Sequence, residues 1–450
     1  MTSLERSRVA GVLRGAACIA FVALIVLSPL RARITLQSRP TLPVYGDYTD
    51  FLLFWSDIAE IAVLALWGAA IAIEHRRIRF RPRFLSWPAV ALLAVAWLGV
   101  AFSVDPPLAA YSALRLTASA ALALYVVNEI HSLAQIVLPA ALMVAVQAVA
   151  GIGQVIGQRS LGLGGLGEAV LSPSMPVSVV TAGDGTRVLR AYGLSDHPNI
   201  LGGVLAIAVL LIAGVAATRT ARTSPWRTVA VALGAAALFL TFSRGAWIAL
   251  VVGLVVLAGM LALDHNRAVL RRLAALCGCG LLVAAPFVLP YQAAVAARTD
   301  QSPSNATEHR SVDERVALSE ATTRILAAHP LLGTGAGTLP VAMRNAEPAF
   351  QYTYQPSSVV LLDVTTETGL IGGAAYLVVL VAPWLALWRR RSRWTPELAV
   401  ASAALAAVTV VGLFDYYTWS YSAGRIWAWL VLGLWIVTYR RATSDVRDAD

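Results

Sequence analysis

Apolar runs long enough to cross a bilayer recur along the whole chain, and they constrain its fold more than any other feature. A transmembrane helix needs about 20 consecutive apolar residues, because backbone polar groups in lipid must be satisfied within the segment. About twelve such segments are present, at roughly 11–30, 51–73, 87–103, 108–128, 133–157, 199–218, 228–243, 245–263, 273–296, 358–388, 396–414 and 423–439. The sequence therefore predicts an all-α, polytopic integral membrane protein with about 12 transmembrane helices.

Basic charge gathers in short loops between these runs. Only 13% of the residues are charged, against about 25% in a soluble protein. The net charge of +10 is carried by arginine, since the chain contains no lysine, and a lysine nucleophile is excluded. Arginine-rich clusters flank the apolar runs at 74–83, 219–227, 264–272, 389–393 and 440–447. Because basic loops face the cytoplasm, we expect a multi-pass protein of the cytoplasmic (inner) membrane, with both termini cytoplasmic and no nucleic-acid partner.

The same count places four longer segments on the outer face. These are residues 31–50, 158–198, 297–357 and 415–422. We treat the chain as a single membrane domain, 1–450, with 297–357 as an extracytoplasmic loop subdomain inserted before the third-last transmembrane helix. The aromatic segment "DYYTWSYSAGRIWAW" (415–429) is typical of a membrane-interface belt, and a sugar-stacking platform is the alternative.

A helix is predicted in the middle of the largest outer loop. The stretch "RSVDERVALSEATTRILAAHPLLGTGAG" (310–337) contains Ser311 and Glu314 at the spacing of a capping box. Apolar and small residues then recur at helical spacing, and Pro330 and three glycines follow. The predicted helix therefore begins near Ser311 and carries Arg310 and Arg315 at its start.

Several arginines fall on the predicted outer face. Arg244 lies between two apolar runs, at a tight turn. Arg190, His197 and Asn199 lie at the entry of another run, 199–218. An arginine at such a place can simply reach the interface, but its planar guanidinium also suits phosphate oxygens. Several arginines on one face predict a clamp for a lipid-linked phosphate compound, presented from the bilayer and stabilised as a leaving group.

Other ionisable residues have simpler interpretations. Arg115 lies within an apolar run, and we expect it to pair with Asp57 or Glu60 as a structural ion pair. The three cysteines lie inside apolar runs at spacings unsuited to metal binding. We expect no metal and no cofactor.

Four sequence blocks resemble the O-antigen ligase and O-antigen polymerase superfamily. They are "RAYGLSDHPNILGG" (190–203), "LTFSRGAW" (240–247), "DERVALSEATTRILAAHPLLGTGAG" (313–337) and "LDVTTETGLIGG" (362–373). The resemblance implies a fold similar to the metal-independent GT-C glycosyltransferases. It also implies transfer of a glycan from an undecaprenyl-pyrophosphate carrier to a glycan or lipid acceptor, at an extracytoplasmic active site.

The resemblance also implies roles for individual residues. The family arginines that engage the pyrophosphate fall on Arg244 and Arg315, which we predict to be catalytic. The family arginine before the "PN" block falls on Arg190. We predict that Arg190, His197, Asn199 and Arg310 bind substrate.

One departure from the family pattern concerns the acceptor. Family ligases carry a histidine nine residues before the glutamate of the "ETG" block, and here that position is Ser358. A serine of ordinary pKa is not a general base near neutral pH. We name His309 and Asp363 as possible general bases, with Glu308 and His197 as further substitutes, and we favour a polymerase slightly over a ligase.

Two other functions are compatible with a chain of this kind. A multi-span membrane transporter of a small anion or glycan would also have about twelve spans, although such carriers often show two repeated halves. An inactive family member would have lost its activity together with the histidine. The three arginines at family positions argue against the second alternative.

Overall fold

The computed structural model describes residues 3–218, 224–299, 306–389 and 394–444, and it is largely helical. Among these residues, eleven helices are long and apolar enough to cross a membrane. They are α1 (Ser3–Leu27), α2 (Trp55–Glu74), α3 (Arg83–Gly99), α4 (Pro106–Glu129), α5 (Ala134–Gly157), α6 (Pro198–Thr218), α8 (Arg244–Leu263), α9 (Arg267–Ala284), α13 (Val360–Trp388), α14 (Pro396–Phe414) and α16 (Ser422–Ser444). The remaining predicted segment, 228–243, forms the shorter apolar helix α7 (Pro225–Leu240). The predicted fold class, an all-α polytopic membrane protein, is confirmed.

Two predicted boundaries are wrong. The run predicted over 51–73 begins with strand β2 (Phe51–Phe54), which pairs antiparallel with β1 (Arg33–Gln37), and the helix starts only at Trp55. The run predicted over 273–296 leaves the α-helix after Ala284, where Pro286 and Pro290 lack backbone N–H donors. The chain then continues into the short helix α10 (Gln292–Thr299).

Helix α6 lies at the centre of the bundle. It packs against α5, α7, α8, α9, α14 and α16, and nearly all of its residues are buried. A helix that is apolar on every side suits either lipid or a protein interior, and here neighbouring helices surround it. The residues that precede α6 are therefore held firmly at one end of the bundle.

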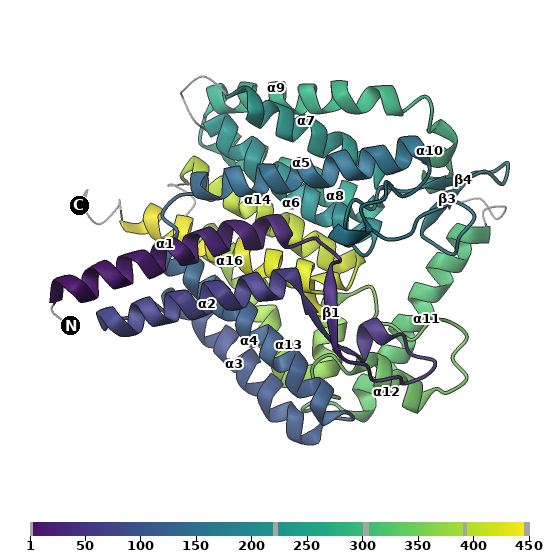
Figure 1. Cartoon of the computed structure of the whole chain (residues 1–450), viewed down its shortest axis with the longest axis horizontal. Coiled ribbons are helices and arrows are strands. Elements are labelled where there is room, and N and C mark those ends of the chain that lie inside the picture. The colour runs from purple at the N-terminus through teal and green to yellow at the C-terminus, as the bar shows by residue number, and fades with distance from the viewer. Residues whose placement is uncertain (1–2, 219–223, 300–305, 390–393, 445–450) are drawn as a thin grey trace.

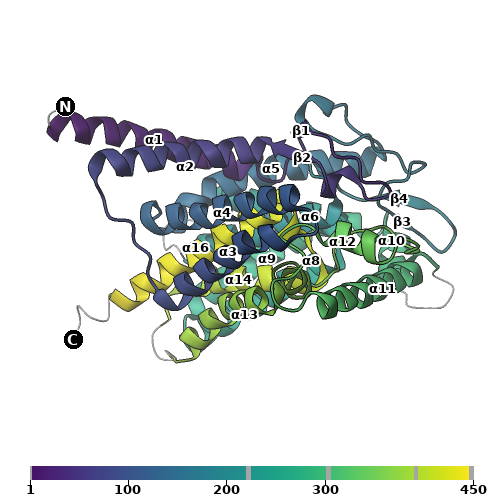
Figure 2. The ribbon, with the colours of Figure 1, turned by 90° about the horizontal axis from the view of Figure 1, so that it is seen from below.

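The two ends of the bundle differ in structure. The start of α1 and the end of α16 lie at one end, which we call the terminal end (Figure 1). Strands β1, β3 (Val179–Thr181) and β4 (Arg187–Leu189) and helices α10, α11 (Ala306–Ala328) and α12 (Leu339–Ala346) lie at the other, which we call the loop end (Figures 1 and 2). The long loops predicted to share the outer face are thus together in space.

Helix α11 begins earlier than predicted. It starts at Ala306, so Ser311 and Glu314 lie inside the helix and form no N-terminal cap. Residues 306–310 form part of the same helix before Ser311, and the capping-box spacing is therefore incidental. Leu318, Thr322 and Ile325 are buried as expected, and the apolar side of the helix packs against α12.

Two glycine-containing blocks meet at the foot of α11. The backbone N–H of Thr334 donates to Thr366 O at 3.0 Å, and that of Gly335 donates to Glu367 O at 2.9 Å. Gly369, with φ 70°, interrupts α13 with a kink. A Cβ at this glycine would overlap the backbone of Leu331, so the close approach requires glycine. These contacts hold the segment that follows α11 against α13.

Candidate functional site

A cavity of about 510 Å³ opens at the loop end between the starts of α6 and α8, the end of α14, and α10 and α11. Four arginines from separate parts of the chain line it, Arg190, Arg244, Arg298 and Arg315. We call it the arginine cavity. Three of these arginines were predicted from the sequence. Arg298 was not predicted, because it lies in a polar stretch where the sequence does not show which way its side chain points.

Arg190 is buried and makes several hydrogen bonds. Its Nε donates to Thr241 O at 2.7 Å and its Nη1 to Ser178 Oγ at 2.7 Å. Its Nη2 donates to Asn199 Oδ1 at 2.6 Å. The guanidinium therefore ties the segment before α6 to the turn between α7 and α8. Its geometry suits positioning of Asn199 better than direct contact with a substrate.

Arg244 is the first residue of α8 and half-buried at the cavity wall. The preceding turn is tight, since Phe242 is fully buried with φ 49°. Arg244 Nη1 donates to Arg298 O at 3.2 Å, which connects it to α10. The first residues of α8 also line the cavity, and N–H groups at a helix start attract anions.

Arg315 reaches the same cavity from α11. It is half-buried and lies where the arginine cavity meets a second cavity of about 690 Å³. The shared wall includes His197, Asn199 and Asp415. We call the second cavity the adjoining cavity. Ser358 and Glu314 line the adjoining cavity and not the arginine cavity.

Asp415 lies at the junction of the two cavities, directly after α14. Its Oδ2 accepts a hydrogen bond from Asn199 Nδ2 at 2.8 Å. Burial raises the pKa of Asp415 above its ordinary value, and the hydrogen bond from Asn199 and the charge of Arg315 oppose that rise. Sequence reasoning missed this residue because it opens the aromatic segment assigned to an interface belt. A lone carboxylate where a span ends was the available signal.

These geometric findings agree with the comparison to known families. Residues 229–377 match the family model described as O-Antigen ligase. This match supports the resemblance of the chain to the O-antigen ligase and polymerase superfamily, from α7 to the middle of α13. A search of curated proteins found no match. The matched region contains Arg244, Arg298, Arg315 and Ser358, whereas Asp415 lies beyond it.

His197, which precedes the matched region, is held as a neutral imidazole. Its Nδ1 accepts a hydrogen bond from the backbone N–H of Asn199 at 3.1 Å. Burial, and then the charges of Arg190, Arg298 and Arg315, lower the pKa of His197 to about 3. The side chain is therefore uncharged at neutral pH, and only a weak base.

This lowered pKa predicts a pH dependence of stability. In the unfolded chain the imidazole takes up a proton near its ordinary pKa of about 6.5, whereas in the folded chain it stays neutral until about pH 3. The free energy of unfolding should therefore fall as pH is lowered from about 6.5 towards 3. His197→Gln should flatten this slope, measured by thermal unfolding in detergent at several pH values. His131→Gln, at an exposed site, is the control, and equal slopes for His197→Gln and wild type would contradict the prediction.

The other predicted site residues lie elsewhere. Arg310 is exposed and lines neither cavity. Asp363 is fully buried in the first turn of α13, where its Oδ1 accepts from the Ser357 N–H at 2.9 Å, and it also lines neither cavity. The side chains of Glu308 and His309 lie outside the described residues. Among the described residues, no group of three or more His, Cys, Asp or Glu side chains could hold a metal ion.

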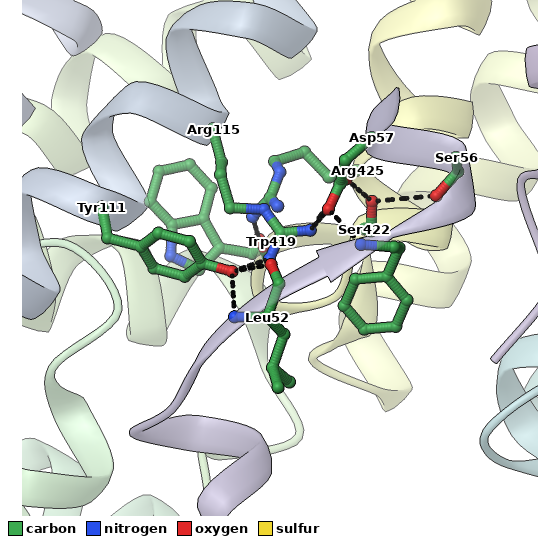
Figure 3. Close-up of polar contacts among 9 residues, drawn as sticks. Leu52, Ser56, Asp57, Tyr111, Arg115, Trp419, Ser422 and Arg425 are labelled. Atoms are coloured by element: carbon green, nitrogen blue, oxygen red, sulfur yellow. Dashed lines mark hydrogen bonds and ion pairs between the residues drawn. The ribbon is translucent and has the colours of Figure 1, made fainter. Parts of the chain in front are cut away.

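A buried polar cluster lies beside the adjoining cavity (Figure 3). Arg115 Nη2 contacts Asp57 Oδ2 at 2.8 Å, so the predicted ion pair with Asp57 is confirmed. The Ser422 hydroxyl donates to Asp57 Oδ1 at 2.6 Å. Arg425 Nη1 donates to Trp419 O at 3.0 Å. The cluster joins α2 and α4 to α16 and surrounds a cavity of only about 60 Å³, room for about two waters.

Proposed function

We propose that the protein transfers or polymerises a glycan carried on undecaprenyl pyrophosphate, at the outer face of the cytoplasmic membrane, without a metal. The observation that carries this proposal is the convergence of Arg244, Arg298 and Arg315 with the start of α8 on one cavity. Fixed positive groups of this kind stabilise the negative charge that develops on a leaving pyrophosphate. The match of residues 229–377 to the O-antigen ligase family model supports the same reaction class.

The two cavities suggest places for the two substrates. The pyrophosphate of the donor would occupy the arginine cavity, and the acceptor sugar would enter the adjoining cavity, whose walls include Tyr416 and Tyr421. The acceptor hydroxyl oxygen forms a bond to the anomeric carbon while the bond from that carbon to the pyrophosphate oxygen breaks. The pyrophosphate leaves with the electron pair, and the hydroxyl proton passes to a base.

Asp415 is the base that the geometry favours. It lies where the two cavities meet, and a carboxylate whose pKa is raised accepts a proton more readily near neutral pH. Asn199, held in turn by Arg190, orients the carboxylate. Ser358, at the position of the family histidine, lines the adjoining cavity without any basic group of its own.

Asp415→Asn should lower the transfer rate by about 10²-fold or more. The amide keeps the size of the side chain but removes the proton acceptor. Transfer would be measured with purified protein in nanodiscs and a mixture of lipid-linked oligosaccharides. Ser358→Ala and Glu314→Gln, both in the adjoining cavity, should keep most of the activity. A large loss in Glu314→Gln together with an active Asp415→Asn would assign the base to Glu314 instead.

The products of the same assay distinguish the remaining functions. Longer lipid-linked chains identify a polymerase, and transfer to a separate acceptor identifies a ligase. If no donor is consumed, and donor binding is unchanged when Arg244 and Arg315 are replaced, the proposal is wrong. Uptake of a small anion or glycan into proteoliposomes would then support a transporter.

The proposed orientation, with the loop end outward and both termini cytoplasmic, is tested by labelling single cysteines at the two ends.

A further inference from the structure

A second arginine-lined cavity lies at the terminal end, whereas the residues of the proposed active site lie at the loop end. Its volume is about 750 Å³. It is bounded by the segment that enters α3, by the end of α4 and by the end of α16. Its basic lining residues are Arg79, Arg81, Arg83, His131, Arg440 and Arg441. We call it the terminal cavity.

The described walls of the terminal cavity carry several positive side chains. No carboxylate is among the described residues that line it. The carboxylate of Glu129, at the end of α4, is engaged by Arg76 and by Trp67. Arg441 has an ion pair with Glu397 at 3.8 Å, outside the cavity lining. Arg79, Arg81 and Arg440 line the same hollow, so an anion between them would reduce the repulsion of their like charges.

The mouth of the terminal cavity is flanked by apolar side chains that face outward. In the stretch "RIRFRPRF" (77–84), arginines alternate with apolar residues. Arg79 and Arg81 line the cavity, whereas Ile78 and Phe80 do not line it and are 37% and 49% exposed. Trp87, one turn further along α3, is 67% exposed. The wall inside the cavity also includes the apolar residues Val127, Ile130 and Val437.

The positive-inside rule alone does not account for this arrangement of arginines. Arg267 and Arg271 belong to another basic cluster and lie exposed on α9. The arginines of the terminal cavity instead come from two parts of the chain and surround a hollow. The hollow has the volume of an ordinary ligand site, and guanidinium groups bind phosphate with two hydrogen bonds each.

We propose that the terminal cavity binds the headgroup of an anionic phospholipid that carries two phosphates, of the diphosphatidylglycerol class. The two phosphates would contact Arg79 and Arg81 on one side and Arg440 on the other. The acyl chains would leave past the exposed apolar residues at the mouth. Basic pockets at the ends of transmembrane helices are suited to such headgroups. This site is independent of the glycan reaction proposed above.

Native mass spectrometry of the full chain in detergent, titrated with diphosphatidylglycerol, tests the proposal. The double variant Arg79→Gln/Arg81→Gln should bind the lipid at least about tenfold more weakly, since charge-assisted hydrogen bonds are lost. Arg440→Gln, on a different helix, should also weaken binding. The matched control is Arg267→Gln/Arg271→Gln, which removes the same charge at exposed positions on α9 and should change binding less than about twofold.

Each other outcome would overturn the proposal in a defined way. Equal weakening in the control would show a general attraction to basic surface. Displacement of the lipid by inorganic pyrophosphate would show that the site takes a soluble diphosphate. Equally tight binding of phosphatidylglycerol, which has one phosphate, would remove the requirement for two. Thermal unfolding of each variant checks that loss of binding is not loss of fold.

Discussion

Arg315→Ala is expected to lower the rate of glycan transfer by about 10²–10³-fold while the protein remains folded. Arg315 comes from α11 and lies where the arginine cavity meets the adjoining cavity, so its charge reaches both of the proposed substrate positions. It is half-buried, and its helix is held by other residues, among them Leu318 and Ile325. Removal of its guanidinium should therefore affect the leaving group much more than the fold. The rate would be measured with lipid-linked oligosaccharide in nanodiscs.

The control for this experiment is Arg344→Ala. Arg344 lies on α12 and lines neither cavity, and its Nη1 donates to the side chain of the neighbouring Asn345 at 3.2 Å. Its replacement removes the same charge from the loop end and should leave the rate nearly unchanged. Arg244→Ala should resemble Arg315→Ala, and the double variant should lose less than the product of the two effects, because the arginines act on one group. Full activity in Arg315→Ala would exclude a pyrophosphate clamp at this cavity.

The sequence alone predicts the membrane helices well and the site only in part. Spans are readable because each has to satisfy its own backbone in lipid, so hydrophobicity and length suffice. Arg244 stands out because it interrupts such a run. Arg298 does not stand out, because its direction depends on how α10 returns to the start of α8. The strand β2 is hidden for a related reason, since its four apolar residues resemble the start of a span.

The role of a residue is harder to predict from the sequence than its place near the cavity. Arg190 and Asn199 were expected to bind substrate, yet they contact each other, and Asn199 contacts Asp415. These contacts join residues from the start of α6 and the end of α14, and no local pattern reports them. Asp363 is close in sequence to the "ETG" block but is buried against Ser357. Proximity in sequence to a family motif therefore did not indicate access to the cavity.

Arg115→Ala is expected to destabilise the protein by about 3–5 kcal/mol, because it leaves the buried carboxylate of Asp57 without its charged partner. The two side chains are only 16% and 12% exposed and lie 2.8 Å apart. The Arg115 guanidinium also lies 5.3 Å from the ring centroid of Phe54. Thermal and denaturant unfolding in detergent would measure the loss. The double variant Arg115→Met/Asp57→Asn should recover most of it, since no charge remains buried and unpaired.

The control is Arg324→Ala. It breaks an ion pair with Glu347 in which the Arg324 side chain is 58% exposed, and it should lower the free energy of unfolding by less than about 1 kcal/mol. A loss as small in Arg115→Ala as in Arg324→Ala would mean that water reaches Asp57 and that the cluster does not hold α2 and α4 against α16.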